Sequence, residues 1–132
     1  MDRSNRNSLA TRIYDSAREV HAYTGPGIMA EVFKSCLAHE LRLRGIRFRT
    51  NPSIAVNYKG IKIEERLYAD FIVEESIILE IVTGKRFTEL HQSKLNTIMF
   101  FSQLELGILI DPSSERMLDG FKRISNPKKL SL

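Results

Sequence analysis

Hydrophobic residues recur every three to four positions in two stretches near the start of the chain, over residues 9–23 and 28–44. This spacing is typical of amphipathic helices, so we predict one helix in each stretch. Gly45 follows the second stretch at the position expected of a helix C-cap. The polar residues 1–8 offer nothing to bury and are predicted to form a flexible N-terminal arm.

The spacing of hydrophobic residues changes after Gly45 to strict alternation, which predicts strands. The strand around residues 77–83 is apolar at nearly every position, as expected of a central strand covered on both faces. Glu80 is the polar exception in it. The other strands are predicted over residues 46–50, 54–58, 61–63, 67–73, 107–110 and 117–124.

A third helix is predicted over residues 88–104, between the central strand and the short buried strand that follows it. The order of elements is therefore two helices, a meander of strands, one crossover helix and closing strands. This order indicates a single α/β (α+β) domain over residues 9–125 with a mixed sheet. Residues 126–132 are assigned to a basic C-terminal tail.

The composition narrows the class of protein. A chain of 132 residues has the length of one domain, and its single Cys36 excludes an intramolecular disulfide or a cysteine-based zinc cluster. No apolar run approaches the roughly 18 residues that cross a bilayer, and the polar N-terminus lacks the apolar core of a signal peptide. We therefore expect no membrane contact and a cytoplasmic location. The net charge of +4 is compatible with a polyanionic partner such as nucleic acid but does not require one.

Two carboxylates stand in apolar strands, Asp70 in one strand and Glu80 in the next. If these strands pair as a hairpin about the acidic turn that joins them, the two carboxylates lie side by side. Such neighbours repel each other unless they share a cation, and oxygen ligands suit Mg²⁺ or Mn²⁺. The alternative is that each carboxylate pairs with a basic side chain such as Arg66 or Lys85.

Short motifs follow one another in order along most of the chain. They are Glu19-Val20-His21, Gly25-Pro26-Gly27, Val32-Phe33, Leu37-Ala38-His39-Glu40-Leu41, Val56-Asn57-Tyr58-Lys59-Gly60, Tyr68-Ala69-Asp70-Phe71-Ile72-Val73, Ile78-Leu79-Glu80-Ile81, His91-Gln92, Gly107-Ile108-Leu109-Ile110 and Asp119-Gly120-Phe121-Lys122-Arg123-Ile124. Over residues 10–125, this series resembles the GxxExxY protein family of the PD-(D/E)XK nuclease-like superfamily. The resemblance implies a small mixed sheet flanked by helices in a restriction-endonuclease-like core. It also implies a metal-dependent nuclease site built from an aspartate, a Glu-x-Lys motif and a helical glutamate.

The resemblance places Asp70 at the superfamily's aspartate and Glu80 at the glutamate of Glu-x-Lys, which makes both expected ligands of Mg²⁺ or Mn²⁺. The lysine of that motif is replaced by Val82. In such nucleases a bound cation lowers the pKa of a water and neutralises developing phosphate charge, and the lysine orients the water or stabilises the oxyanion. Valine does neither, so the site motif is partly degenerate.

The motif that names the family is also altered. Ala30 and Phe33 occupy the positions of its glutamate and its tyrosine, and Glu31 is displaced by one residue. One residue on a helix is a rotation of about 100°, so Glu31 does not occupy the same point. Glu31 and Glu40 are candidate supporting carboxylates, and for Glu40 the alternative is an ion pair with Arg44 at i,i+4.

Lys94 is our candidate for a lysine that has moved to another element. It lies three residues after His91 on the third predicted helix, so the two side chains share a face and Lys94 has the reach to assist at the metal. Lys85 is the weaker candidate. His91 is a candidate general base, and its alternative role is to cap the helix. For Lys94 the alternative is an ordinary surface lysine beside a site that has lost its function.

Basic side chains cluster near the end of the second predicted helix and after the central strand. They offer contacts to phosphate groups without specifying bases. For Arg47 and Arg49 the alternative is an edge strand whose charges discourage aggregation. The candidate nucleic-acid contacts are Arg47, Arg49, Lys85 and Arg86, and Arg42 and Arg44 belong to the same basic cluster.

The leading hypothesis is therefore a metal-dependent nuclease that hydrolyses phosphodiester bonds, with Asp70, Glu80, Lys94 and His91 as its site. The second is a catalytically inactive nuclease-fold module that binds nucleic acid or a protein partner. A third is a self-associating structural protein, with an apolar helix side as the interface of a homodimer. Metal binding separates the first hypothesis from the other two, and salt-dependent binding to nucleic acid separates the second from the third.

Overall fold

A five-stranded mixed sheet forms the centre of the computed structural model, which describes residues 1–82, 84 and 87–127. Its strand order is β1-β6-β7-β8-β9, and β7 and β8 run parallel while the other neighbours in it run antiparallel. The strands are β1 Phe48–Thr50, β6 Phe71–Val73, β7 Ile77–Ile81, β8 Leu106–Ile110 and β9 Phe121–Ser125. The parallel pair is joined by helix α3, Glu89–Ser102, as a crossover connection requires.

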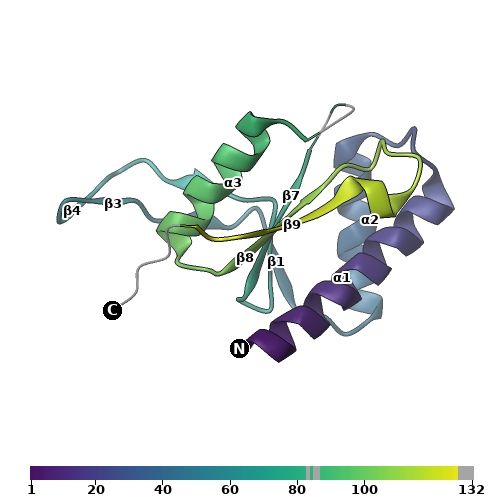
Figure 1. Cartoon of the computed structure of the whole chain (residues 1–132), viewed down its shortest axis with the longest axis horizontal. Helices are drawn as coiled ribbons and strands as arrows, with labels where there is room; N and C mark the ends of the chain where they lie inside the picture. Colours follow the sequence, from purple (N-terminus) through teal and green to yellow (C-terminus); the bar gives the residue numbers. More distant parts are fainter. Residues whose placement is uncertain (83, 85–86, 128–132) are drawn as a thin grey trace.

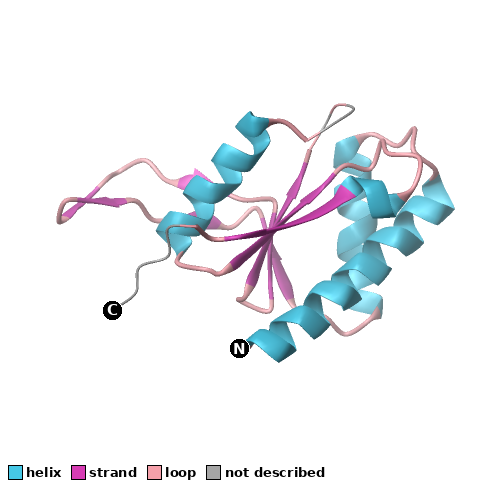
Figure 2. Ribbon diagram, viewed as in Figure 1, coloured by secondary structure: helices cyan, strands magenta, loops and turns pink. Residues whose placement is uncertain are grey.

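Helices cover both faces of this sheet (Figures 1 and 2). Helices α1, Arg3–Thr24, and α2, Ala30–Leu43, pack on one face, and α3 packs on the other. Side chains of β7 alternate between the faces, so Leu79 packs with α1 and α2 while Ile78 packs beneath α3. The central strand is thus buried on both sides, and the mixed α/β fold predicted from the sequence is confirmed.

The first helix begins earlier than predicted. Residues 3–8, which the hydrophobic pattern assigns to a flexible arm, form the first turns of α1, and that assignment is wrong. The carboxylate of Asp2 caps the helix by accepting a hydrogen bond from the backbone N–H of Asn5 at 2.8 Å. Arg6 then ties this turn to the body of the protein through an ion pair with Glu105 at 2.9 Å. Capping and a distant charge stabilise a turn that has no apolar face of its own.

Two of the predicted long strands are broken into short pieces. Strand β2, Ser53–Ile54, pairs with β5, Leu67–Tyr68, and β3, Asn57–Tyr58, pairs with β4, Ile61–Lys62. The β3–β4 hairpin extends away from the main body of the fold, at the left of Figure 1. The predicted closing strand over 117–124 begins instead as a 3₁₀ turn, Met117–Gly120, before β9.

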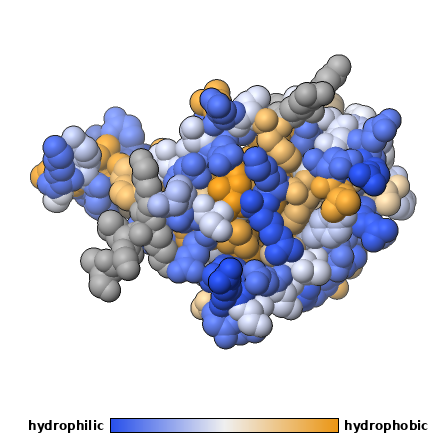
Figure 3. Space-filling view, viewed as in Figure 1, coloured by the Kyte–Doolittle hydropathy of each residue, from blue (hydrophilic) through white to orange (hydrophobic). Residues whose placement is uncertain are grey.

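Polar side chains dominate the face of the molecule seen in Figure 3, with apolar patches between them. Most apolar side chains are instead used in the two layers that sandwich the sheet. Among the residues that the structure describes, no helix has the length and apolar character needed to cross a membrane.

Candidate active site

Asp70 and Glu80 lie next to each other where β6 and β7 separate. The register pairs Phe71 with Leu79, so Asp70 and Glu80 are the next opposed positions on the face that α3 covers. The backbone N–H of Asp70 donates to Glu80 Oε2 at 3.3 Å, and the N–H of Ile81 donates to Asp70 Oδ2 at 2.7 Å. The pair predicted from the hairpin register is thus brought together, and each carboxylate accepts a hydrogen bond from the opposite strand.

The strand before Asp70 turns aside at this point. The carbonyl of Asp70 accepts a hydrogen bond from the N–H of Asn51 at 2.9 Å, and the neighbouring Ala69 N–H donates to Pro52. These bonds lead the chain out of the main sheet and into the β2–β5 pair. Because the ladder opens here, the backbone N–H groups of Asp70 and Ile81 are available to the two carboxylates.

Lys34, on α2, supplies the cation beside this pair. Its Nζ lies 2.9 Å from Asp70 Oδ1 and 3.0 Å from Glu31 Oε1. Burial acts to lower the pKa of Lys34, but its hydrogen bonds to Asp70 and Glu31 and their charges outweigh burial and raise that pKa above the usual value. The ammonium group is therefore charged. No local pattern in the sequence pointed to Lys34, because it lies on a different element far from Asp70 along the chain.

Of the two cations considered from the sequence as partners of the pair, Arg66 has a different partner. Arg66 donates to the hydroxyl of Ser53 at 2.9 Å, and Lys85 lies outside the described residues.

Glu80 is the unusual acid of the site. Burial, its hydrogen bond with Asp70 and the negative charge of Asp70 raise its pKa from 4.5 to about 8. The single positive charge of Lys34 acts in the opposite direction but does not offset these effects. Near neutral pH, without a further cation, Glu80 therefore carries a proton while its neighbour is paired with Lys34. A divalent cation between the two oxygens would favour the ionised form of both.

A cavity of about 380 Å³ opens on the pair and reaches α3. His91 and Lys94 line it from the first two turns of α3, as their shared helix face predicted, and Tyr68 stands at its edge with 57% of its surface exposed. The structure therefore brings both predicted α3 side chains to the cavity of the carboxylates. Besides these groups it is lined by Lys34, Asp70, Glu80, Ile81, Val82, Ile98 and Leu109.

His91 also caps its helix. Its backbone N–H donates to Thr88 Oγ1 at 3.2 Å, and its Nδ1 accepts from the Thr88 N–H at 3.2 Å. Because Nδ1 is an acceptor, the proton of a neutral His91 ring is on Nε2. The capping role weighed from the sequence is thus present together with a place in the cavity wall.

Val82 stands where the lysine of a Glu-x-Lys motif would be. It follows Glu80 by two residues and so points to the same face, where it is buried in the apolar layer under α3. Its N–H donates to the carbonyl of Ile110 at 2.8 Å, which keeps the strand in register past β7. Within the described chain, the lysines that line this cavity are Lys34 and Lys94.

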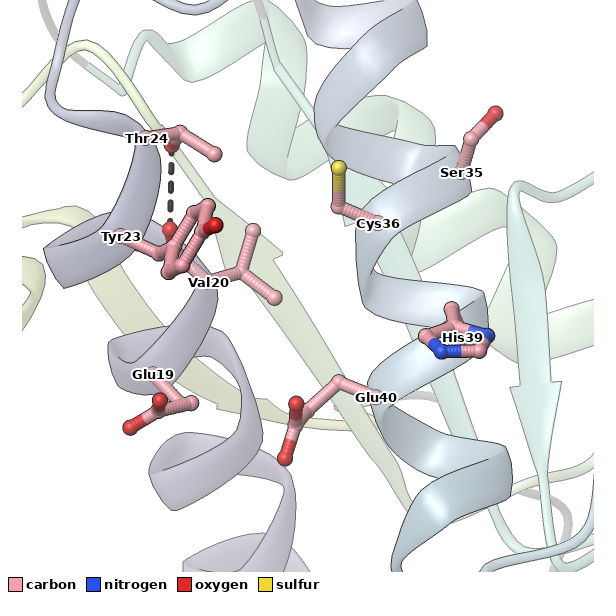
Figure 4. Close-up of a pocket in the computed structure, with 8 residues that line it drawn as sticks. All are labelled: Glu19, Val20, Tyr23, Thr24, Ser35, Cys36, His39 and Glu40. Atoms are coloured by element: carbon pink, nitrogen blue, oxygen red, sulfur yellow. Dashed lines mark hydrogen bonds between the residues drawn. The ribbon is translucent and has the colours of Figure 1, made fainter.

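The supporting carboxylates predicted on α2 separate. Glu31 forms an ion pair with Lys34, which in turn forms an ion pair with Asp70, so Glu31 is linked to the carboxylate pair through Lys34. Glu40 instead accepts a hydrogen bond from Arg44 Nε at 2.6 Å, which is the i,i+4 ion pair considered as its alternative. Glu40 lines a different cavity, of about 350 Å³, between α1 and α2 (Figure 4).

The cavity between α1 and α2 does not form a second reactive centre. The thiol of Cys36 lies between the helices, but the imidazole of His39 is turned away from it (Figure 4). No hydrogen bond joins these two side chains. A thiol without a neighbouring base has no evident activation, so Cys36 is read as a packing residue.

Arg47 and Arg49 lie at the opposite end of the β6–β7 hairpin. They form ion pairs with Glu74 at 3.2 Å and Glu75 at 2.7 Å, in the turn that joins the two strands. That turn is four residues from Asp70, a separation of ~13 Å along a strand. The structure therefore does not bring these arginines to the carboxylate pair. Lys85 and Arg86, the other predicted nucleic-acid contacts, lie outside the described residues.

The residues present fit a divalent cation of modest affinity. Within residues 1–82, 84 and 87–127 no cluster of three or more His, Cys, Asp or Glu side chains is arranged to hold a metal ion. Mg²⁺, however, is commonly held by one or two carboxylates, with water and substrate phosphate completing its shell. Asp70 and Glu80 supply those two carboxylates, and burial together with the neighbouring Asp70 raises the pKa of Glu80, an effect that a cation bound between them would oppose.

Comparison with known proteins gives a consistent result. A family model described as the PD-(D/E)XK nuclease superfamily matches residues 7–124. Among solved structures, "Crystal structure of SSO0001" is similar with a TM-score of 0.52 and 20% identity. The match covers 93% of this chain and 63% of that chain, so this chain spans less than two thirds of that protein. Such a distant likeness supports the fold alone. No curated protein matches the sequence.

Proposed function

Since this chain belongs to the PD-(D/E)XK nuclease superfamily, we propose that it is a divalent-metal-dependent nuclease that hydrolyses phosphodiester bonds of nucleic acid. The observation that carries the proposal is the juxtaposition of Asp70 and Glu80 at the opening of the β6–β7 pair, with lysines from two helices in the same cavity. A carboxylate pair that lacks sufficient counter-charge beside ammonium groups is suited to a cation and a phosphate together.

Asp70 and Glu80 would hold Mg²⁺ or Mn²⁺. Such a cation supplies Lewis acidity toward phosphate and water. The half-buried position of both carboxylates and their bonds to backbone N–H groups fix their direction before any ligand arrives. Glu80 must lose its proton to serve as a ligand, so its raised pKa links cation binding to proton release.

Lys34 and Lys94 take the role that Val82 leaves open. Lys34 is already within 2.9 Å of Asp70, and Lys94 reaches into the same cavity from α3. Either ammonium would neutralise charge on a phosphate oxygen bound at the pair. The Nε2–H of His91 is a further donor on that wall, since Nδ1 is held by Thr88.

The second candidate is a nuclease-fold module that binds nucleic acid or a protein partner without cleaving it. Val82, packed in the apolar layer where a lysine would be expected, is the observation that favours it. In that case the ammonium of Lys34 would be the permanent counter-ion of Asp70. The cytoplasmic location and the homodimer expected from the sequence stay predictions.

Cleavage assays separate these candidates. Single- and double-stranded DNA and RNA would be incubated with the protein and Mg²⁺ or Mn²⁺, and the products followed on denaturing gels. We expect the wild type to cleave nucleic acid and Glu80→Gln to lose about 100-fold or more of this cleavage rate. Glu75→Gln should cleave at the rate of the wild type. Glu75 is a matched control because it is a carboxylate of the same hairpin at its far end. No cleavage of any substrate, or equal cleavage by Glu80→Gln, would overturn the nuclease proposal.

A further inference from the structure

A second groove, of about 610 Å³, leads away from the carboxylate pair on the side opposite α3. It lies between α2 and the strands β1 and β6, and it shares Lys34 and Asp70 with the cavity that contains Glu80. The two spaces therefore meet at the Lys34–Asp70 ion pair. Its other lining residues are Glu31, Ser35, Ala38, Arg42, Thr50, Asn51 and Phe71.

One wall of this groove is a single stripe of α2. Lys34, Ala38 and Arg42 are spaced by four residues, so they stand one above another on successive turns. The small side chain of Ala38 leaves room between the two cations. Lys34 and Arg42 are eight residues apart, which corresponds to ~12 Å along the helix axis. The facing wall carries the hydroxyl of Thr50 and the amide of Asn51, both on exposed residues.

Arg42 differs from the arginines around it. Arg44, Arg47 and Arg49 each form an ion pair with a glutamate. Arg42 has no carboxylate partner among the described residues, and its guanidinium lies 5.1 Å from the centre of the Phe48 ring. Stacking on Phe48 orients the guanidinium but leaves its N–H donors free. The groove thus contains an oriented cation without a counter-charge.

We propose that this groove takes the backbone of a nucleic-acid strand on one side of the cleaved bond, with Arg42 binding a phosphate of the same strand farther along from the one at Asp70 and Glu80. This inference rests on the proposed function, which places the reacting phosphate at the carboxylate pair. A guanidinium binds phosphate through two parallel N–H···O bonds, and hydroxyl and amide groups such as those of Thr50 and Asn51 contact phosphate or sugar without reading sequence.

The occupant is a polyanion strand for two reasons of charge. Glu31 and Asp70 share the ammonium of Lys34, whereas the guanidinium of Arg42 has no carboxylate partner among the described residues. Arg42 also lies in a groove that begins at a carboxylate pair suited to a cation and phosphate. A strand with regularly spaced phosphates would contact both the cation site at the carboxylate pair and the guanidinium of Arg42. The contacts involve no base edge, so the groove selects nucleic acid without selecting its sequence.

Binding measured without cleavage tests this inference. Fluorescence anisotropy of labelled single-stranded DNA and RNA would be recorded in EDTA over a salt series, for the wild type, Arg42→Ala and Arg47→Ala. Arg47→Ala is the matched control, since it removes an arginine that is paired with Glu74 on another part of the surface. We expect Arg42→Ala to weaken binding about fivefold to tenfold and to reduce the salt slope by about one, and Arg47→Ala to stay within about twofold of wild type.

Several outcomes overturn the inference, and three of them come from the binding series itself. They are no binding by the wild type, equal losses in Arg42→Ala and Arg47→Ala, and equally tight, Arg42-dependent binding of polyglutamate, which would indicate an acidic peptide instead. Competition by inorganic phosphate alone at micromolar concentration would indicate a free phosphate rather than a strand and would also overturn it. Cleavage is measured in a separate assay. If the wild type cleaves nucleic acid but Arg42→Ala binds the strand as tightly as the wild type, the nuclease proposal stands and this inference fails.

Discussion

Asp70 and Glu80 each accept a hydrogen bond from the backbone of the other's strand, at 2.7 Å from Ile81 N–H to Asp70 and at 3.3 Å from Asp70 N–H to Glu80. These backbone hydrogen bonds fix the positions of the two carboxylates relative to each other. Lys34 compensates one of them, and burial beside the other carboxylate leaves Glu80 with a pKa of about 8. This imbalance of charge is what a divalent cation would correct.

The stability of the metal-free protein is expected to depend on pH through Glu80. The pKa of Glu80 is about 8 in the folded protein and 4.5 in an unfolded chain. Between these two pH values, the folded protein therefore binds more protons than the unfolded protein does. The stabilisation is complete below about pH 4.5 and is lost as pH rises through about 8.

Urea unfolding of the wild type and Glu80→Gln in EDTA at pH 5, 7 and 9 checks this dependence. Glutamine cannot ionise, so the free energy of unfolding of the wild type should fall relative to the variant by about 4 kcal/mol between pH 5 and 9. A constant difference between the two proteins across this range would show that Glu80 ionises normally.

Lys34→Ala is expected to separate metal binding from cleavage. The ammonium competes with a cation for Asp70, so its removal should tighten Mn²⁺ binding by roughly threefold to tenfold. Loss of its charge beside phosphate should at the same time lower cleavage by about tenfold or more. Calorimetric titration and the cleavage assay give the two values. Lys62→Ala, in the projecting hairpin, is the control and should change neither.

Lys94→Ala tests the other lysine of the cavity. Lys94 has no ion pair with a described residue, and it lines the cavity from α3. Its removal should lower cleavage by about tenfold while leaving the affinity for Mn²⁺ within about twofold of wild type. If cleavage by Lys94→Ala equals that of the wild type, Lys94 is a surface lysine and Lys34 alone takes the place left by Val82.

Gly107 sets how closely α3 approaches the sheet. A Cβ at this position in β8 would lie 2.8 Å from the buried side chain of Leu95, which packs α3 onto the strand. Gly107→Ala should therefore lower the free energy of unfolding by about 1–3 kcal/mol, and adding Leu95→Val should restore part of it. Gly27→Ala is the control, because nothing lies within 4 Å of its added Cβ. Thermal unfolding of all four proteins measures these differences.

Hydrophobic spacing was sufficient to predict the main elements of the fold. The two N-terminal helices, the central strand β7 and the crossover helix α3 follow from the spacing of their apolar residues, because burial on one or two faces imposes that spacing. The turn at residues 3–8 did not follow, since a cap from Asp2 and a distant pairing of Arg6 with Glu105 stabilise it. The break before Asp70 did not follow either, because it depends on bonds to Asn51 and to the carboxylates.

The parts of the site on the β6–β7 hairpin and on one face of α3 were predictable from the sequence, but the part on α2 was not. Asp70 and Glu80 are near-symmetric about their turn, so antiparallel pairing alone brings them together. Lys34 arrives from a helix packed on the other face of the sheet, and no spacing in the sequence reports that approach. The sequence also does not indicate that Arg42 lacks a carboxylate partner, because the partners of the neighbouring arginines are known only once the strands are placed.

Calorimetric titration of Mg²⁺ and Mn²⁺ at pH 8, with and without inorganic phosphate, tests the central claim that the Asp70–Glu80 pair holds a divalent cation. The proteins compared are the wild type, Asp70→Asn combined with Glu80→Gln, and Glu74→Gln combined with Glu75→Gln as a control of equal charge change. We predict one ion per chain for the wild type and the control, and no binding by the Asp70/Glu80 variant. No binding by the wild type at millimolar metal with phosphate present, or the same binding by all three proteins, would contradict the claim.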